Sequence, residues 1–249
     1  MTKVRKPEKK GRFAMCRMPI GEQDDAVLYD ERDGRYIDGR SDGFPDICIA
    51  IMKEAGAFER IMSAESILDI GAGTGQLIAR LAEMKPGARI VGIEPCREAR
   101  AIAVPGANLV ESDDGVFEVV MCWHVLEHVF DPPAFVKDMV NRTRNGGLVI
   151  IATPNQASPF SWSKMWRGWI ANHIYVMRRS MVRELMREAG LEVVSEMTWG
   201  GFPAPRAWWQ EALNKAAKFF GVGDNMIIVG VKKKVAVRDN GVIYAMNHV

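Results

Sequence analysis

Short apolar runs alternate with amphipathic stretches over most of this chain. Apolar runs bounded by glycine or polar residues predict seven buried strands. The runs lie at residues 67–70, 88–94, 108–111, 117–123, 148–155, 191–198 and 225–231. Because helical patterns separate most of these runs, the chain is typical of an α/β protein with helices on both faces of a mostly parallel sheet.

The helical segments carry apolar residues at intervals of three and four. The clearest covers residues 45–62, where Ile47, Ile51 and Phe58 share one face. A second helix is expected after the glycines at 71–75, and a third from the proline pair at 132–133 to a glycine stop at Gly146-Gly147. Two later helices are expected at residues 180–189 and 206–220.

Length and composition fit one sizeable domain with accessory segments. The chain has 249 residues, 48% apolar and 26% charged, with a net charge of +2 and four cysteines. These values are ordinary for a globular protein and identify no charged partner. No apolar run approaches the ~18 residues of a membrane span, and no secretory signal is recognised. The scattered cysteines favour neither zinc nor disulfides, and a reducing cytoplasm is expected.

Charge divides the chain into segments. Residues 1–18 are rich in Lys and Arg and are expected to form a disordered basic arm. Residues 19–65 are interpreted as an N-terminal cap segment, acidic and loop-like at first, that ends in the first helix. The core domain is expected at 66–234, and residues 235–249 are interpreted as a short tail.

The central motif is an apolar strand that runs into a glycine-rich turn and then a helix. Gly71, Gly73 and Gly75 alternate directly after the first strand. Residues without a Cβ allow a sharp turn and let a ligand approach main-chain N–H groups at a helix N-terminus. The dinucleotide fingerprint requires glycine where this chain has Gln76, and it needs no acid at Asp69. A nucleotide-like ligand other than NAD is therefore predicted.

Residues 69–75 resemble the first motif of class I S-adenosylmethionine-dependent methyltransferases. The resemblance extends over about residues 66–232. It implies a Rossmann-like, doubly wound sheet of seven strands in the order 3-2-1-4-5-7-6, with strand 7 antiparallel between strands 5 and 6. It also implies S-adenosylmethionine as the cofactor.

The same resemblance implies roles for individual residues. The Asp69 carboxylate would lie close to the cofactor's ammonium, and Glu94, at the end of the second strand, would bind the ribose hydroxyls. An acid after the third strand would bind the adenine amine, and Asp113 is preferred to Asp114. The other expected cofactor-binding residues are Gly71, Ala72, Gly73, Gly75, Gln76, Pro95 and Cys122.

The segment after the fourth strand, residues 124–132, resembles that of ubiquinone-biosynthesis-like small-molecule O-methyltransferases. Its polar residues should line the pocket, because ligands gather at the carboxyl ends of parallel strands. His128 is a candidate base, with Glu127 beside it, and His173 competes for the role. Some relatives bind a divalent metal here, but His124 replaces the first acid, so no metal is expected.

Two stretches, 156–177 and 199–224, are interpreted as aromatic lid insertions over the acceptor. The predicted reaction is methyl transfer to a small-molecule acceptor such as a sugar, phenol or polyketide, with oxygen favoured as the methylated atom. One alternative is a nucleic-acid methyltransferase that uses the basic arm and the Trp-rich lid. The other is a non-catalytic protein that binds S-adenosylmethionine.

Overall fold

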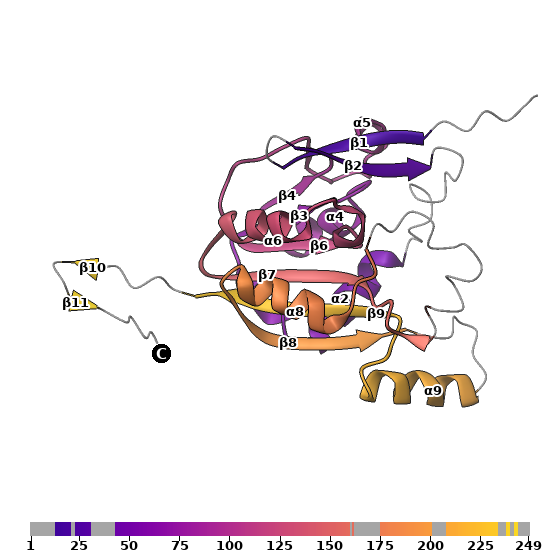
Figure 1. Ribbon diagram of the computed structural model, residues 1–249. Coiled ribbons are helices and arrows are strands. Elements are labelled where there is room, and N and C mark those ends of the chain that lie inside the picture. Colours follow the sequence, from indigo (N-terminus) through magenta and orange to yellow (C-terminus); the bar gives the residue numbers. More distant parts are fainter. Residues whose placement is uncertain are drawn as a thin grey trace, which may run out of the picture.

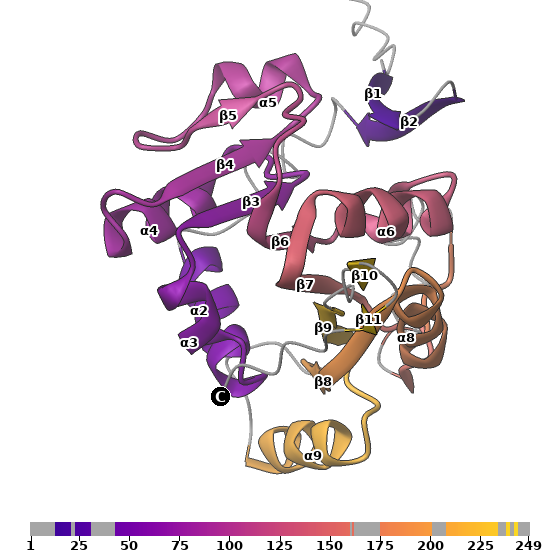
Figure 2. The same cartoon turned by 90° about the vertical axis from the view of Figure 1, so that its left-hand side faces the viewer.

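The computed structural model describes residues 13–20, 23–30, 43–159, 161, 175–200, 208–233, 238–239 and 242–243. Its centre is a sheet of seven strands. Figures 1 and 2 show this sheet from two directions. The strands are β3 (Ser66–Ile70), β4 (Arg89–Ile93), β5 (Leu109–Val110), β6 (Phe117–Trp123), β7 (Thr143–Pro154), β8 (Leu191–Trp199) and β9 (Asn225–Lys232). Two further short strands, β10 (Arg238–Asp239) and β11 (Val242–Ile243), pair with each other.

The order of the seven strands is β5-β4-β3-β6-β7-β9-β8. Strands β3 to β7 pair in parallel, whereas β9 is antiparallel to both β7 and β8. This confirms the predicted order 3-2-1-4-5-7-6 with an antiparallel seventh strand. The carboxyl ends of β3, β4, β6 and β7 consequently lie along one edge of the sheet.

Apolar side chains alternate between the two faces of the sheet and form two cores. On one face, Leu68, Val120 and Val149 pack with residues of α6 and α8. On the other face, Ile67 and Met121 pack with residues of α2, α3 and α4. Figure 2 shows the two groups of helices on opposite sides of the sheet. Both faces are therefore covered, as a parallel sheet requires.

The helices have the bounds α2 (Phe44–Glu54), α3 (Phe58–Ser63), α4 (Gln76–Met84), α5 (Arg97–Ala101), α6 (Pro132–Asn141), α8 (Arg179–Glu188) and α9 (Trp208–Phe219), with a 3-10 turn η2 (Leu126–His128). The single helix predicted at 45–62 is wrong, because the chain breaks at Gly56, whose φ is +72°. The glycine stop at 146–147 is also wrong. Helix α6 ends at Asn141, and both glycines belong to β7.

The N-terminal segment contains a β-hairpin that the sequence pattern did not predict. Strand β1 (Phe13–Ile20) pairs antiparallel with β2 (Gln23–Asp30), in a register that joins Ile20 to Gln23. The expected disorder of residues 1–18 and the expected loop-like start of the 19–65 segment are therefore wrong over these strands. Only Gly21 and Glu22 separate the paired residues, and a two-residue connection that begins with glycine is a common hairpin signature.

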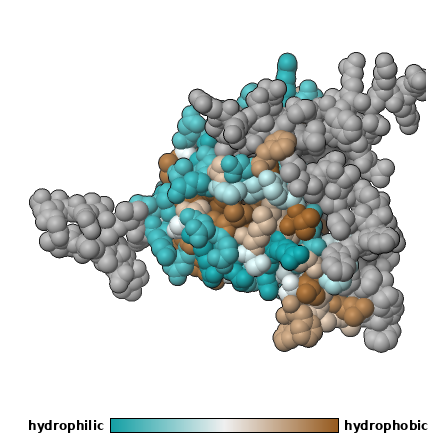
Figure 3. Space-filling view, in the orientation of Figure 1, coloured by the Kyte–Doolittle hydropathy of each residue, from teal (hydrophilic) through white to brown (hydrophobic). Residues whose placement is uncertain are grey.

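Helix α9 lies beside β8 at one end of the sheet and exposes apolar side chains. Leu213 on the helix, Phe219 at its end and Phe220 after it are exposed, and this region is brown in the space-filling view (Figure 3). None of the described helices is both long and apolar enough to cross a membrane.

Candidate active site

The glycine-rich turn joins β3 to α4 at the shared strand edge. Gly71, Gly73 and Gly75 have φ of +78°, +60° and +82°, a region that residues with a Cβ rarely adopt. A Cβ on Gly71 would lie 2.4 Å from a methyl carbon of Val125, and one on Gly75 would lie 2.5 Å from Cβ of Ala107. The turn thus depends on glycine both for its conformation and for the space around it.

Glu94 holds this turn against the loop that follows β4. Its side chain is fully buried, with 0% exposed. Oε2 accepts a hydrogen bond from the main-chain N–H of Gly73 at 2.8 Å, and Oε1 accepts one from the N–H of Cys96 at 2.9 Å. Because a carboxylate accepts about four hydrogen bonds, Glu94 can accept from ligand hydroxyls as well.

Asp69, in β3, brings a second carboxylate to the same edge, and it is 2% exposed. Cys122 lies on the neighbouring strand β6, and its thiol is completely buried. Burial, and then the negative charges of Asp69 and Glu127, raise the pKa of Cys122 well above its ordinary value. Cys122 is therefore a neutral thiol near two carboxylates, which suits a pocket wall and not a nucleophile.

The remaining residues of the predicted cofactor site lie along the same turns. Ala72 is buried, and its N–H donates to the carbonyl of Ile93 at 3.1 Å. Gln76 is the first residue of α4, and Pro95 follows Glu94; both are partly exposed. Ala72, Gln76 and Pro95 thus lie on the turns beside Asp69 and Glu94, and their contact with a cofactor stays a prediction.

Asp113 does not belong to this group, which corrects the prediction. Its carboxylate accepts hydrogen bonds of 3.0 and 2.7 Å from Arg89, the first residue of β4, at the amino end of that strand. The short connection between β5 and β6 returns the chain directly to the other edge of the sheet. Asp113 is therefore an ion-pair partner at the amino ends of the strands and not an adenine ligand. Glu111, directly after β5, is the acid closer to the carboxyl edge, and it pairs with Arg100 at 2.9 Å.

A second group of polar residues follows β6 and centres on the buried carboxylate of Glu127. Glu127 Oε2 accepts a hydrogen bond from the hydroxyl of Thr153, near the end of β7, at 2.8 Å. Its Oε1 lies 3.5 Å from His124 Nδ1 and 3.8 Å from His128 Nε2. The structure therefore brings the predicted pair Glu127 and His128 together and adds His124 and Thr153.

The two histidines give Glu127 its electrostatic character. Burial by itself would raise the pKa of Glu127, but the hydrogen bond and charge of His124, and then the charge of His128, outweigh it. The net effect is a pKa below the ordinary carboxyl value. Glu127 is therefore an anion that can orient a neighbouring imidazole and stabilise its protonated form.

His124 occupies the first position after β6 in a strained conformation. Its φ is +57°, and no other non-glycine residue in the described part of the chain has a positive φ. Such conformations cost about 1–3 kcal/mol and cluster at functional sites. The His124 side chain is 31% exposed and that of His128 only 7%. His124 is thus the more accessible of the two imidazoles.

Several predicted features fall outside the described residues. His173 is one of them, as are most of the 156–177 insertion and part of the 199–224 insertion. Within the parts of the chain that the structure describes, no three His, Cys, Asp or Glu side chains gather closely enough to hold a metal ion.

Two residues of this site were missed by sequence reasoning. His124 stood out only as a replacement for an acid, and nothing in the sequence signals its left-handed backbone. Thr153 was interpreted only as part of a buried strand. Its position at the end of β7, next to the end of β6, is the signal that could have identified it.

A family model described as a methyltransferase domain matches residues 44–196. The ubiquinone biosynthesis O-methyltransferase of Maricaulis maris is 28% identical over 159 residues, which are 54% of this chain and 62% of that protein. The corresponding protein of Acinetobacter baylyi is 25% identical over 175 residues, which are 59% of this chain and 72% of that protein. The match thus spans less than two thirds of the Maricaulis protein.

Solved structures show the same fold. A SAM-dependent methyltransferase from Archaeoglobus fulgidus superposes with a TM-score of 0.60 at 15% identity, over 80% of this chain and 100% of that one. At this identity the likeness shows a shared fold. The observed strand order agrees with it.

Proposed function

This chain belongs to the methyltransferase domain family, and we propose that it transfers the methyl group of S-adenosylmethionine to a hydroxyl oxygen of a small-molecule acceptor. The observation that supports this most is the pair of buried carboxylates at one sheet edge, Asp69 and Glu94. Glu94 is fixed by the main chain of a glycine turn that has no room for side chains. The ammonium and ribose hydroxyls of S-adenosylmethionine are hydrogen-bond donors that match these two carboxylates.

The residues present fit that cofactor. The Asp69 carboxylate would pair with the ammonium of the methionine part, and the Glu94 carboxylate would accept hydrogen bonds from the ribose hydroxyls. Gly71 and Gly73 let the main chain approach the ligand closely. The neutral thiol of Cys122 adds no third negative charge to this edge.

When bound, S-adenosylmethionine supplies an electrophilic methyl group on a sulfonium ion. An acceptor oxygen would take this methyl group in exchange for its own proton, and the demethylated sulfur would stay on the cofactor. The protein contributes orientation of the acceptor, exclusion of water and a base for that proton.

The cluster around Glu127 provides the base. His124 or His128 accepts the acceptor's proton, and Glu127 stabilises the resulting imidazolium. Thr153 holds the other carboxylate oxygen in place. The greater exposure of His124 favours it for direct contact with the acceptor. His173 remains a candidate from the sequence.

The acceptor class follows by analogy with the relatives. Both bacterial relatives are named for O-methylation in ubiquinone biosynthesis, and a base made of imidazole and carboxylate suits a hydroxyl. A phenol-type or other small hydroxylated acceptor is therefore proposed.

A binding titration and a methyl-transfer assay test the proposal separately. S-adenosylhomocysteine, the demethylated cofactor, should bind with saturable heat in calorimetry, and Asp69→Asn should weaken it. Methyl-labelled cofactor should then label a phenol or catechol in an acceptor panel. Absence of cofactor binding by the wild-type protein would refute the whole proposal, whereas binding followed by labelling only of RNA or DNA would overturn the acceptor class.

A further inference from the structure

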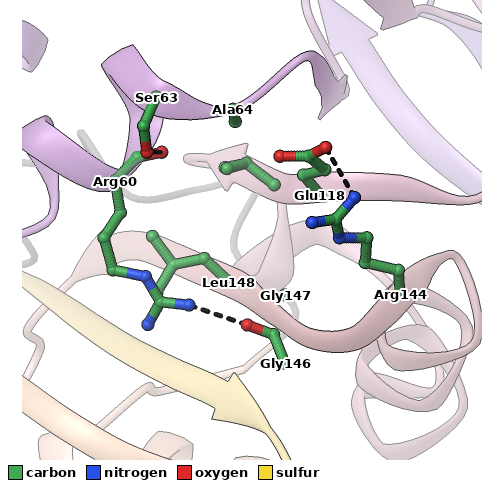
Figure 4. Close-up of a pocket in the computed structure, with 9 residues that line it drawn as sticks. Arg60, Ser63, Ala64, Glu118, Arg144, Gly146, Gly147 and Leu148 are labelled. Atoms are coloured by element: carbon green, nitrogen blue, oxygen red, sulfur yellow. Dashed lines mark hydrogen bonds and ion pairs between the residues drawn. The ribbon is translucent and has the colours of Figure 1, made fainter. Parts of the chain in front are cut away.

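A cavity lies at the amino ends of β6 and β7 (Figure 4). This is the edge of the sheet opposite to the one near Asp69 and Glu127. The volume of the cavity is about 150 Å³. Arg60 and Ser63 reach it from α3, Glu118 from β6, and Arg144 and the following glycines from β7. None of these residues takes part in the proposed methyl-transfer site.

A β-bulge creates this hollow. Thr143 of β7 pairs with Phe117, and the next paired residue of β7 is Leu148, opposite Val119. Residues 144–147 therefore stand against Glu118 alone, and the regular ladder is interrupted there. Gly146 has φ +79°, and a Cβ on the buried Gly147 would lie 2.7 Å from the Glu118 carbonyl oxygen. Larger residues at these positions would disturb the bulge.

Two guanidinium groups flank the cavity. Arg60 Nη2 donates to the carbonyl oxygen of Gly146 at 2.7 Å, which fixes the Arg60 side chain across the bulge. Arg144 Nη1 pairs with Glu118 Oε1 at 2.6 Å. Figure 4 shows the two arginines on opposite sides of the hollow. Because a guanidinium has five N–H donors, each arginine can donate further hydrogen bonds to a ligand.

The charges around the cavity leave a positive excess. Arg60 and Arg144 contribute two positive charges, and Glu118 contributes one negative charge. The remaining lining is main chain, the Ser63 hydroxyl and the uncharged side chains of Ala64, Val119 and Leu148. An anion is therefore the ligand that this surface favours, and planar guanidinium forks match tetrahedral oxyanions well.

We propose that this cavity binds a small oxyanion of the phosphate type between Arg60 and Arg144. The volume corresponds to roughly five water molecules at ~30 Å³ each, which is enough for a phosphate group with a few waters. Only the phosphate group of a larger ligand would fit inside the cavity, and the rest of the ligand would lie outside it. The ligand is thus inorganic phosphate or a phosphomonoester. The site lies apart from the methyl-transfer site and does not depend on that function.

Glu118 sets the affinity of the site. In the ligand-free protein its carboxylate holds Arg144. A bound anion shares Arg144 with this carboxylate and is repelled by it. Removal of the Glu118 charge should therefore strengthen anion binding, a result that a purely structural ion pair would not produce.

Calorimetric titration at constant ionic strength tests the proposal with inorganic phosphate and with glycerol 3-phosphate. The wild-type protein should bind phosphate saturably in the millimolar range. Arg60→Ala and Arg144→Ala should each weaken binding by about tenfold, the effect of one charge-assisted hydrogen bond. Glu118→Gln should tighten it by a few-fold. Arg80→Ala removes an exposed arginine of α4 outside this cavity and should leave binding unchanged.

The comparison of the two ligands identifies the source of the phosphate group. Tighter binding of glycerol 3-phosphate indicates a phosphomonoester, and equal or weaker binding indicates inorganic phosphate. The proposal is overturned if the wild-type protein shows no saturable binding of either compound. It is also overturned if a folded Arg144→Ala variant, checked by circular dichroism, binds as well as the wild type, or if Glu118→Gln weakens binding.

Discussion

The carboxylate of Glu94 accepts a hydrogen bond from the main-chain N–H of Gly73, and this bond joins the turns that follow two neighbouring strands. The same carboxylate also accepts from Cys96 through its other oxygen. A residue expected to bind the cofactor's ribose therefore also shapes the glycine turn beneath the cofactor. If Glu94 binds the ribose as proposed, cofactor binding and the shape of this turn depend on the same buried side chain.

Glu94→Gln should weaken both cofactor binding and the folded glycine turn. The glutamine side chain has one acceptor oxygen and one NH₂ group, so it would face one of the two N–H donors with another donor. We expect at least a tenfold loss of S-adenosylhomocysteine affinity and a loss of unfolding free energy of about 1–3 kcal/mol. Calorimetry and chemical denaturation measure the two effects. Glu83→Gln, an exposed carboxylate on α4, is the matched control and should change neither quantity.

Asp69→Asn should weaken binding of the methionine half of the cofactor and leave binding of the adenosine half unchanged. Its carboxylate is proposed to pair with the ammonium, which adenosine lacks. We therefore expect about a tenfold weaker binding of S-adenosylhomocysteine, the effect of one charged hydrogen bond, and little change for adenosine. Equal losses for the two ligands would show that Asp69 acts through the shape of the pocket and not through charge.

Gly71→Ala should destabilise the glycine turn for two separable reasons. The new Cβ would lie 2.4 Å from Val125 Cγ2, and the backbone φ of +78° disfavours any side chain. A loss of about 2–4 kcal/mol in unfolding free energy is expected from the two effects together. Val125→Ala in the same protein should restore only the part due to the clash, measured against the Val125→Ala single variant by urea denaturation.

His124→Gly should separate stability from activity. Glycine adopts φ of +57° without the steric cost that His124 carries, but the change also removes the His124 interaction with the buried Glu127 carboxylate, so the two effects oppose each other and the thermal midpoint should change little. The rate constant kcat should fall at least about a hundredfold if His124 is the base. His128→Gln provides the comparison. If it lowers kcat more than His124→Gly does, His128 is the base.

Glu127→Gln should change how stability depends on pH. The folded-state pKa of Glu127 is lower than its ordinary value, so the folded state favours the carboxylate. The stability that this contributes is fully present above the ordinary carboxyl pKa, about 4.3, and is lost as pH falls through the lower folded-state pKa. The wild type should therefore lose stability relative to Glu127→Gln as the pH is lowered below about 4.3. Guanidine denaturation from neutral to acidic pH measures this difference, and a constant difference would contradict the lowered pKa.

The sequence predicted the central strands well because most of them are compact apolar runs between polar or glycine residues, although β7 begins five residues before its predicted start. Strand β6 has the predicted bounds, and β8 and β9 differ by a single residue. The break at Gly56 was not predicted because the apolar face continues on both sides of it. The hairpin of β1 and β2 was not predicted because β1 is largely apolar and β2 is acidic at both ends, so neither strand shows the apolar–polar alternation that a half-buried strand carries.

The positions of Asp69 and Glu94 could be predicted because each lies at or near the end of an apolar run, which the structure forms as β3 and β4. Their contacts with a cofactor stay predictions. Asp113 was misplaced because no sequence pattern shows at which edge a short connection turns. The lowered pKa of Glu127 requires the folded positions of His124, His128 and Thr153, which only the structure supplies.

Strand β9 lies between β7 and β8, although it follows both in the chain. During synthesis, β7 therefore leaves the ribosome long before the partner that completes its hydrogen bonding. Until residues 225–232 emerge, the apolar edge of β7 remains open to pairing with other nascent chains. Synthesis of β9, the last strand of this sheet to be translated, thus determines when the exposed edge of β7 is covered and can no longer pair with another chain.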